Sequence, residues 1–165
     1  MTMDIVYKAI VVGVIATAVM DLWALLAKKL FNIPSLNYAM VGRWLGNIFD
    51  GHFTHPTIAN APAIRGERVL GWTAHYVIGV FFAMLLLLIM GHSWMQHPTV
   101  LPPLLFGMAS VVAPFFILQP GMGAGFAASK TPNPAVARSR SFMAHSAFGV
   151  GLALAVQLVK NSGWF

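Results

Sequence analysis

The sequence has 165 residues, of which 58% are apolar and only 8% are charged, and its mean hydropathy is +0.75. A soluble domain carries about 25% charged residues because its surface faces water, so this composition excludes an ordinary soluble protein. The absence of cysteine excludes disulfides, thiolate metal sites and iron–sulfur clusters, and the net charge of +6 comes without the basic, aromatic-rich stripe of a nucleic-acid-binding protein.

The hydrophobic pattern predicts an all-α integral membrane protein, a four-helix bundle forming a single domain over residues 1–165. The four segments lie at about 5–27, 70–90, 100–118 and 142–159, each close to the roughly 20 residues that cross a bilayer. Pro114 falls inside the third segment, where a membrane helix tolerates a kink. The lipid bilayer is therefore the main expected partner.

The first segment has the charge order of a retained helix. Asp4 precedes it, and Lys28 and Lys29 follow it, whereas a cleaved signal peptide has its positive charge before the apolar run.

The connection from 28 to 69 is too long to be a simple turn. Pro34-Ser35 is typical of a helix start, with Ser35 as N-cap, and apolar residues then recur at helical spacing as far as Ile48, before Gly51 ends the segment. This pattern predicts an amphipathic helix at about 35–50 that lies on the membrane surface. The second long connection, 119–141, is rich in glycine and proline, and we expect it to be irregular.

Lysine and arginine are distributed unevenly along the chain. The two long connections carry eight of them, whereas the termini and the turn at 91–99 carry only Lys8 and Lys160. Cytoplasmic loops of membrane proteins carry the excess of positive charge. We therefore expect the long connections in the cytoplasm and both termini on the non-cytoplasmic side of the membrane.

An internal repeat links the second and fourth segments. The pattern A-H-x-x-x-G-V-x-x-A occurs at residues 74–83 and again at 144–153. A real repeat would make each half of the chain a two-helix hairpin, and the halves would be parallel repeats about an axis along the membrane normal. His75 and His145 would then lie at equal depth and face each other.

Several polar residues are expected in one leaflet, next to the long connections, because the helices alternate in direction. The main members are Asp21, His75 and His145. The secondary members are Arg43, Glu67 and Gln119. Ionisable groups in apolar surroundings cost free energy unless they are paired, so this convergence is the main functional signal. By contrast, His52 and His55 fall in a loop, and of two interpretations, half of a metal site or an exposed loop pair, we expect the exposed, solvated pair.

Four interpretations of this cluster stay open. In the first, the polar residues pair with one another and lock the bundle. In the second, His75 and His145 are axial ligands of a haem b, and Gly79 and Gly149, one turn away, leave room for the macrocycle.

In the third interpretation, His75, His145 and Asp21 hold a divalent metal as a 2-His-1-carboxylate site. In the fourth, the cluster carries protons or a small molecule through a transporter. The sequence neither indicates nor excludes an enzyme, and a homo-oligomer or a role as partner in a membrane complex fits the same features.

Four short motifs also occur together. They are Val41-Gly42-Arg43-Trp44, Gly66-Glu67 before Gly71-Trp72-x-x-His75-Tyr76, Gln119-Pro120-Gly121-Met122-Gly123 and His145-x-x-x-Gly149-x-Gly151-Leu152. With these motifs nearly the whole chain resembles a bacterial family of small inner-membrane proteins, domain-of-unknown-function family 2938. The resemblance implies a four-helix protein of the bacterial inner membrane, and it implies no activity, cofactor or catalytic residue.

Overall fold

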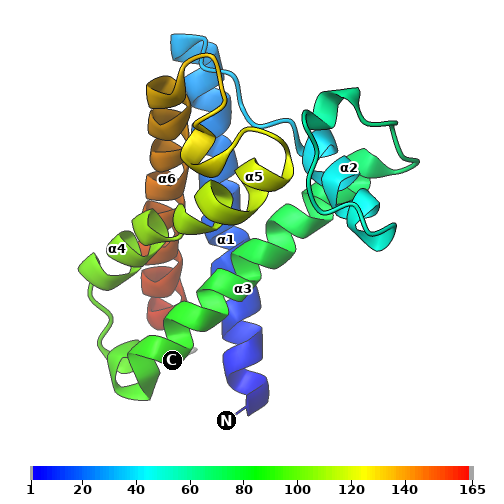
Figure 1. Ribbon diagram of the computed structural model, residues 1–165. Helices are drawn as coiled ribbons and strands as arrows, with labels where there is room; N and C mark the ends of the chain where they lie inside the picture. Colours follow the sequence, from blue (N-terminus) through cyan, green and yellow to red (C-terminus); the bar gives the residue numbers. More distant parts are fainter. Residues whose placement is uncertain (1, 164–165) are drawn as a thin grey trace. The chain divides into compact units, whose positions relative to one another are not determined.

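The computed structural model describes residues 2–163, and within them all regular secondary structure is helical, with no β-strand (Figure 1). The longer helices are α1 (Thr2–Phe31), α2 (Tyr38–Phe49), α3 (Glu67–Gln96), α4 (Leu101–Ala109) and α6 (Pro134–Asn161). The shorter helical turns are η1 (Ile58–Asn60), η2 (Pro114–Leu118), α5 (Gln119–Gly121) and η3 (Phe126–Ala128). The predicted all-α fold class is confirmed.

Four helical segments in this part of the chain are long and apolar enough to cross a membrane. They are Asp4–Phe31, Glu67–Gln96, Leu101–Gly121 and Pro134–Asn161. Each overlaps one of the four predicted segments and is longer than it. Large apolar side chains such as Leu25, Leu30 and Val77 are exposed on these helices, as expected where lipid takes the place of water. The chain is thus a membrane protein with four candidate spans.

The helix in the first long connection begins later than predicted. Asn37 is the N-cap of α2, and its Oδ1 accepts a hydrogen bond from the Ala39 N–H at 3.1 Å, so the prediction of Ser35 as the cap is wrong. Serine and asparagine cap helices about equally well, and the two stand two positions apart, so residue type alone does not select between them. Gly51 follows the helix with a φ of 81°, which confirms the predicted stop.

The third span is not one continuous α-helix. After α4 ends at Ala109, Pro114 begins the wider, π-type turn of η2, in which the Gln119 N–H donates to the Pro114 carbonyl, five residues earlier. Proline has no N–H, and its ring crowds the preceding turn, which explains an irregularity at this point. The kink expected at Pro114 therefore takes the form of a locally widened helix.

The contacts within the chain divide it into two compact units. Unit 1 comprises residues 1–34, 76–110 and 143–165, and unit 2 comprises residues 35–75 and 111–142. The boundaries at 75/76 and 142/143 fall inside α3 and α6, so each of these helices contributes to both units. The single domain predicted for residues 1–165 stays a prediction.

The core of unit 1 lies between α1, the second part of α3 and α6. Its buried apolar side chains include Val12, Ala16, Ala83, Leu86, Phe148, Leu152 and Val156. Figure 1 shows α1 and α6 side by side and antiparallel, and a Cβ added to Gly151 would lie 2.7 Å from Ala16 Cα. Small residues let membrane helices approach this closely, and the resulting van der Waals contact holds them together.

In unit 2, α2 crosses the first turns of α3 at two glycines. A Cβ on Gly42 would collide with the carbonyl oxygen of Glu67, and a Cβ on Gly71 would collide with that of Tyr38. The two backbones are therefore in direct contact. This crossing places the side chains of Tyr38 and Arg43 against α3.

Candidate functional site

Asp21 and His145 are ionisable residues of unit 1 that lie inside candidate spans, and each has a hydroxyl partner on another segment. The Tyr76 hydroxyl, on α3, donates to Asp21 Oδ2, on α1, at 2.9 Å. His145 Nδ1, on α6, lies 2.7 Å from the Oγ of Ser110, which directly follows α4. Both hydrogen bonds join segments far apart in the sequence, so they connect the helices of unit 1.

Glycines bring the helices of unit 1 close enough for these bonds to form. A Cβ on Gly107 would collide with the backbone of Gly149, so the end of α4 rests directly on α6. Ser110 lies three residues after Gly107, and His145 lies four residues before Gly149, so these side chains meet one turn from the crossing. A Cβ on Gly13 would likewise lie only 2.5 Å from Val80 Cα, which puts α1 against α3 near the Asp21–Tyr76 pair.

Unit 2 holds His75 among aromatic side chains. His75 Nε2 lies 3.0 Å from the Tyr38 hydroxyl, and the two rings are tilted against each other with their centroids 4.3 Å apart. The Trp72 ring contacts both, with centroids 4.4 Å from Tyr38 and 5.9 Å from His75. Tyrosine and tryptophan of this kind are enriched where a membrane meets water, because their rings are apolar and their tips are polar.

Arg43 is the buried cation of unit 2, and it uses its whole guanidinium group. Its Nε and one terminal nitrogen donate to the two carboxylate oxygens of Glu67 at 2.8 and 2.9 Å. The other terminal nitrogen donates to the carbonyls of Ala61 at 2.9 Å and Ala59 at 3.3 Å. The hydrogen bond to Glu67 raises the pKa of Arg43 above its usual value. Arg43 thus joins α2, η1 and the start of α3 as a permanent cation.

Gln119 lies where the glycine-rich turn at 119–125 packs against residues 53–58. The His55 and Ile58 N–H groups donate to the carbonyls of Gly121 and Met122 at 3.0 and 3.1 Å. Gln119 Nε2 lies 3.2 Å from Ser141 Oγ, to which it donates. Gln119 Oε1 and His55 Nδ1 are both buried without a protein hydrogen-bond partner. The expectation of a solvated His55 is therefore wrong for its Nδ1 atom, because packing of this loop against the turn buries it.

Residues 10–159 match the family described as a protein of unknown function, DUF2938. The chain belongs to this family. No curated protein and no solved structure matches it. Membership of DUF2938 confirms the resemblance expected from the motifs, and the family description supplies no chemistry.

In this DUF2938 protein, only Arg43 and Glu67 among the predicted polar residues are joined by a hydrogen bond described above, and the others bond to residues outside the predicted set. Asp21 meets Tyr76, His75 meets Tyr38, His145 meets Ser110, and Arg43 meets Glu67. Within residues 2–163, no three His, Asp or Glu side chains form a group that could hold a metal ion. The space beside Gly79 is occupied by the Thr17 side chain, and that beside Gly149 by the backbone of Leu104 and Gly107.

The hydroxyl partners Tyr38, Tyr76 and Ser110 are missing from the set predicted from the sequence. A signal was present for one of them, since Tyr76 directly follows His75 in a conspicuous motif. No sequence pattern links Tyr38 to His75 or Ser110 to His145, because these pairs depend on how the glycine crossings align the helices.

Proposed function

We propose that this protein is a transporter of the bacterial inner membrane that moves protons, alone or together with a small polar solute. Its proton-exchanging groups are Asp21, His75 and His145. The observation that carries the proposal is that each of these ionisable groups shares a hydrogen bond with a hydroxyl group on another segment. Ionisable residues within spans are rare and are used for proton relays and substrate pathways.

The packing of small residues favours this function over that of a docking partner for another membrane helix. Such a partner needs an exposed stripe of small residues on a span. The glycines of the spans at positions 13, 79, 107, 149 and 151 are instead buried in contacts within unit 1. The ionisable groups within the spans, and not a stripe of small residues, are therefore the features on which we base the function.

Haem or metal binding is the second candidate, with His145 as a ligand. It is favoured by the Ser110–His145 bond, because histidines that bind metals usually have their other ring nitrogen held by a second group. A visible absorption spectrum of the purified protein tests it. A Soret band lost in His145→Gln supports haem binding, and a featureless spectrum from haem-supplied cells opposes it.

The transport proposal is tested in proteoliposomes that contain a pH-sensitive dye and carry an imposed membrane potential. Assays run with and without the low-molecular-mass fraction of a bacterial extract cover transport of protons alone and together with a solute. We expect flux above that of protein-free liposomes, and a strong loss of flux in Asp21→Asn and His145→Gln.

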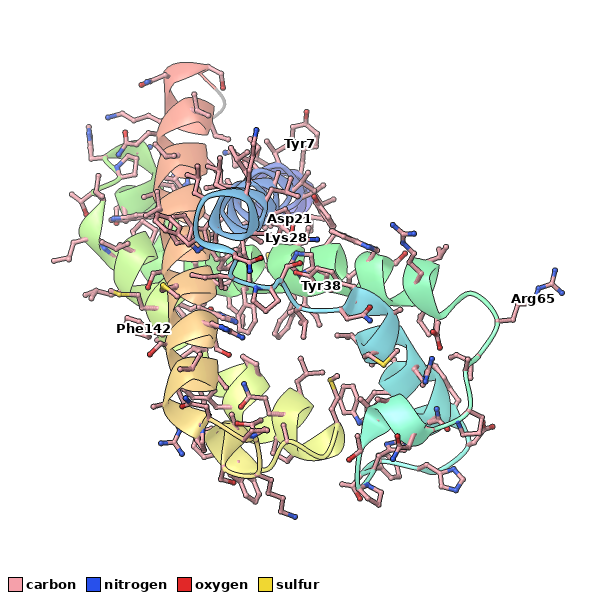
Figure 2. The ribbon with its side chains drawn as sticks, turned by 90° about the horizontal axis from the view of Figure 1, so that it is seen from above. Tyr7, Asp21, Lys28, Tyr38, Arg65 and Phe142 are labelled. Carbon is pink, nitrogen blue, oxygen red and sulfur yellow. The ribbon has the colours of Figure 1, made fainter. Side chains whose placement is uncertain are left out.

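Tyr76→Phe and Tyr7→Phe form a matched pair for the same assay. Tyr76 donates to Asp21, whereas Tyr7 projects from the same helix as Asp21 and is 53% exposed (Figure 2). We expect Tyr76→Phe to lower the flux and Tyr7→Phe to leave it unchanged. Wild-type protein that shows no flux under either condition would overturn the proposal and leave the polar pairs as locks between helices.

The proposal also includes the orientation of the chain. Arg43 is bound to Glu67, so seven of the eight basic residues in the long connections are left to determine the topology. The termini and the turn at 91–99 carry only Lys8 and Lys160. We expect alkaline phosphatase to be active when it is fused after the last span and inactive when it is fused within residues 50–60. The reverse pattern would contradict the predicted orientation, and fluorescent-protein fusions at the same sites control for expression.

A further inference from the structure

Ser110 has two close partners in unit 1 but only one hydroxyl proton. Its Oγ lies 2.6 Å from the carbonyl oxygen of Gly107 and 2.7 Å from His145 Nδ1. A carbonyl oxygen has no proton to give, so the short contact with Gly107 requires that Ser110 donate there. Serine in a helix commonly forms this type of bond to the carbonyl of the preceding turn.

The proton between Ser110 and His145 must then come from the imidazole. We infer that Ser110 keeps a proton on Nδ1 of His145, so that in the neutral imidazole Nε2 is the nitrogen with the lone pair. A neutral imidazole has one protonated nitrogen and one bare nitrogen, and the hydrogen bond made by one nitrogen selects the role of the other. Ser110 is therefore a positioning residue, because it acts through His145.

The crossing of α4 and α6 places Ser110 against His145. A Cβ on Gly107 would collide with Gly149, and a Cβ on Gly149 would lie 2.7 Å from the Leu104 carbonyl oxygen, so the two backbones are in direct contact. Ser110 is 6% exposed, so water has little access to replace either of its hydrogen bonds. The proton of His145 is thus assigned by the packing of two helices.

The lone pair on Nε2 defines the chemistry available at His145. Nε2 takes up a proton to give an imidazolium with both nitrogens protonated, and it returns that proton from the same atom while Nδ1 keeps its bond to Ser110. The same atom would bind a hydrogen-bond donor or a metal. Naming Nε2 as the exchanging atom rests on the proposed transport function, whereas the tautomer follows from the hydrogen bonds alone.

Nitrogen NMR of protein labelled with ¹⁵N-histidine tests the inference, at a pH where imidazole is neutral. The signals of His145 are assigned from their loss in His145→Gln. We expect Nδ1 to have the shift of a protonated ring nitrogen and Nε2 that of a bare one. In Ser110→Ala we expect the proton to move to Nε2, in full or in part, whereas Ser110→Thr keeps the hydroxyl and the original tautomer.

Ser162→Ala is the matched control, because Ser162 also follows a span and bonds a carbonyl three residues earlier, that of Val159. It should leave the His145 signals unchanged. Wild-type protein with its proton on Nε2, or an unchanged tautomer in folded Ser110→Ala, overturns the inference. The expected tautomer without proton flux would reject the transport function and leave the role of Ser110 intact.

Discussion

Gly42→Ala is expected to destabilise unit 2 severely, whereas Gly46→Ala, one turn later in α2, is expected to be tolerated. A methyl group on Gly42 would collide with the carbonyl of Glu67 and approach the backbone nitrogen of Gly71. A methyl group on Gly46 would instead meet the end of the Ile64 side chain, which can rotate away. The two variants add the same atoms to the same helix, so they differ only in what these atoms meet.

The measurement is thermal unfolding in detergent, followed by the fluorescence of the tryptophans and by proteolysis of the loop at 50–66. Alanine is favoured over glycine in a helix by about 1 kcal/mol, and this gain is common to both variants. Overpacking typically costs about 1–3 kcal/mol, and a collision with backbone lies at the upper end because no rotamer relieves it. Equal melting temperatures for the two variants would show that α2 and α3 are not in backbone contact.

Arg43→Lys is expected to destabilise unit 2 nearly as much as Arg43→Ala. Arginine reaches both oxygens of Glu67 and two carbonyls at once because its donors form a rigid, planar fork. A lysine ammonium is a single point and cannot span these acceptors. Without the guanidinium group, Glu67 would lose both hydrogen bonds from Arg43. Of the hydrogen bonds described for its carboxylate, it would keep the one from the Ile64 N–H, at 3.2 Å.

The same unfolding assay tests this prediction, with Arg65→Ala as its control. Arg65 lies two residues before Glu67, the first residue of α3, and its side chain extends away from the chain (Figure 2). We expect a fall of several degrees in melting temperature for both Arg43 variants and little change for Arg65→Ala. If Arg43 acted only on membrane topology, Arg43→Lys would keep the charge and leave the melting temperature unchanged.

The helical spans follow from the sequence because their cause is local. A run of about 20 apolar residues is long enough to cross a bilayer whatever its neighbours are, so all four spans were predictable. The start of α2 was harder to predict, because Ser35 and Asn37 are about equally good caps and residue type does not select between them. The sequence predicted an irregularity at Pro114, but it did not predict that this irregularity is a π-type turn.

The ionisable residues that bond between segments were conspicuous in the sequence, but the pairs that they form were not predictable. Asp21, His75 and His145 are conspicuous because ionisable residues are rare in apolar segments. Their partners are hydroxyl groups, which are common in such segments, and only Tyr76, next to His75 in a conspicuous motif, had a signal. The Ser110–His145 pair depends on Gly107 resting on Gly149, a contact between segments about 40 residues apart. Such a pair can be identified only when the three-dimensional arrangement of the helices is known.

The contacts of unit 1 also set an order of assembly during synthesis. The contact of α1 with α3, through Gly13 and Val80, needs only the first 96 residues, so it can form early. The nine-residue α4 contacts α3 through Phe106 and Phe82, but its backbone contact with α6, through Gly107 and Gly149, needs the end of the chain. Chains fold in parts as they leave the ribosome. The Ser110–His145 hydrogen bond beside that contact is therefore among the last contacts of unit 1 to form during synthesis.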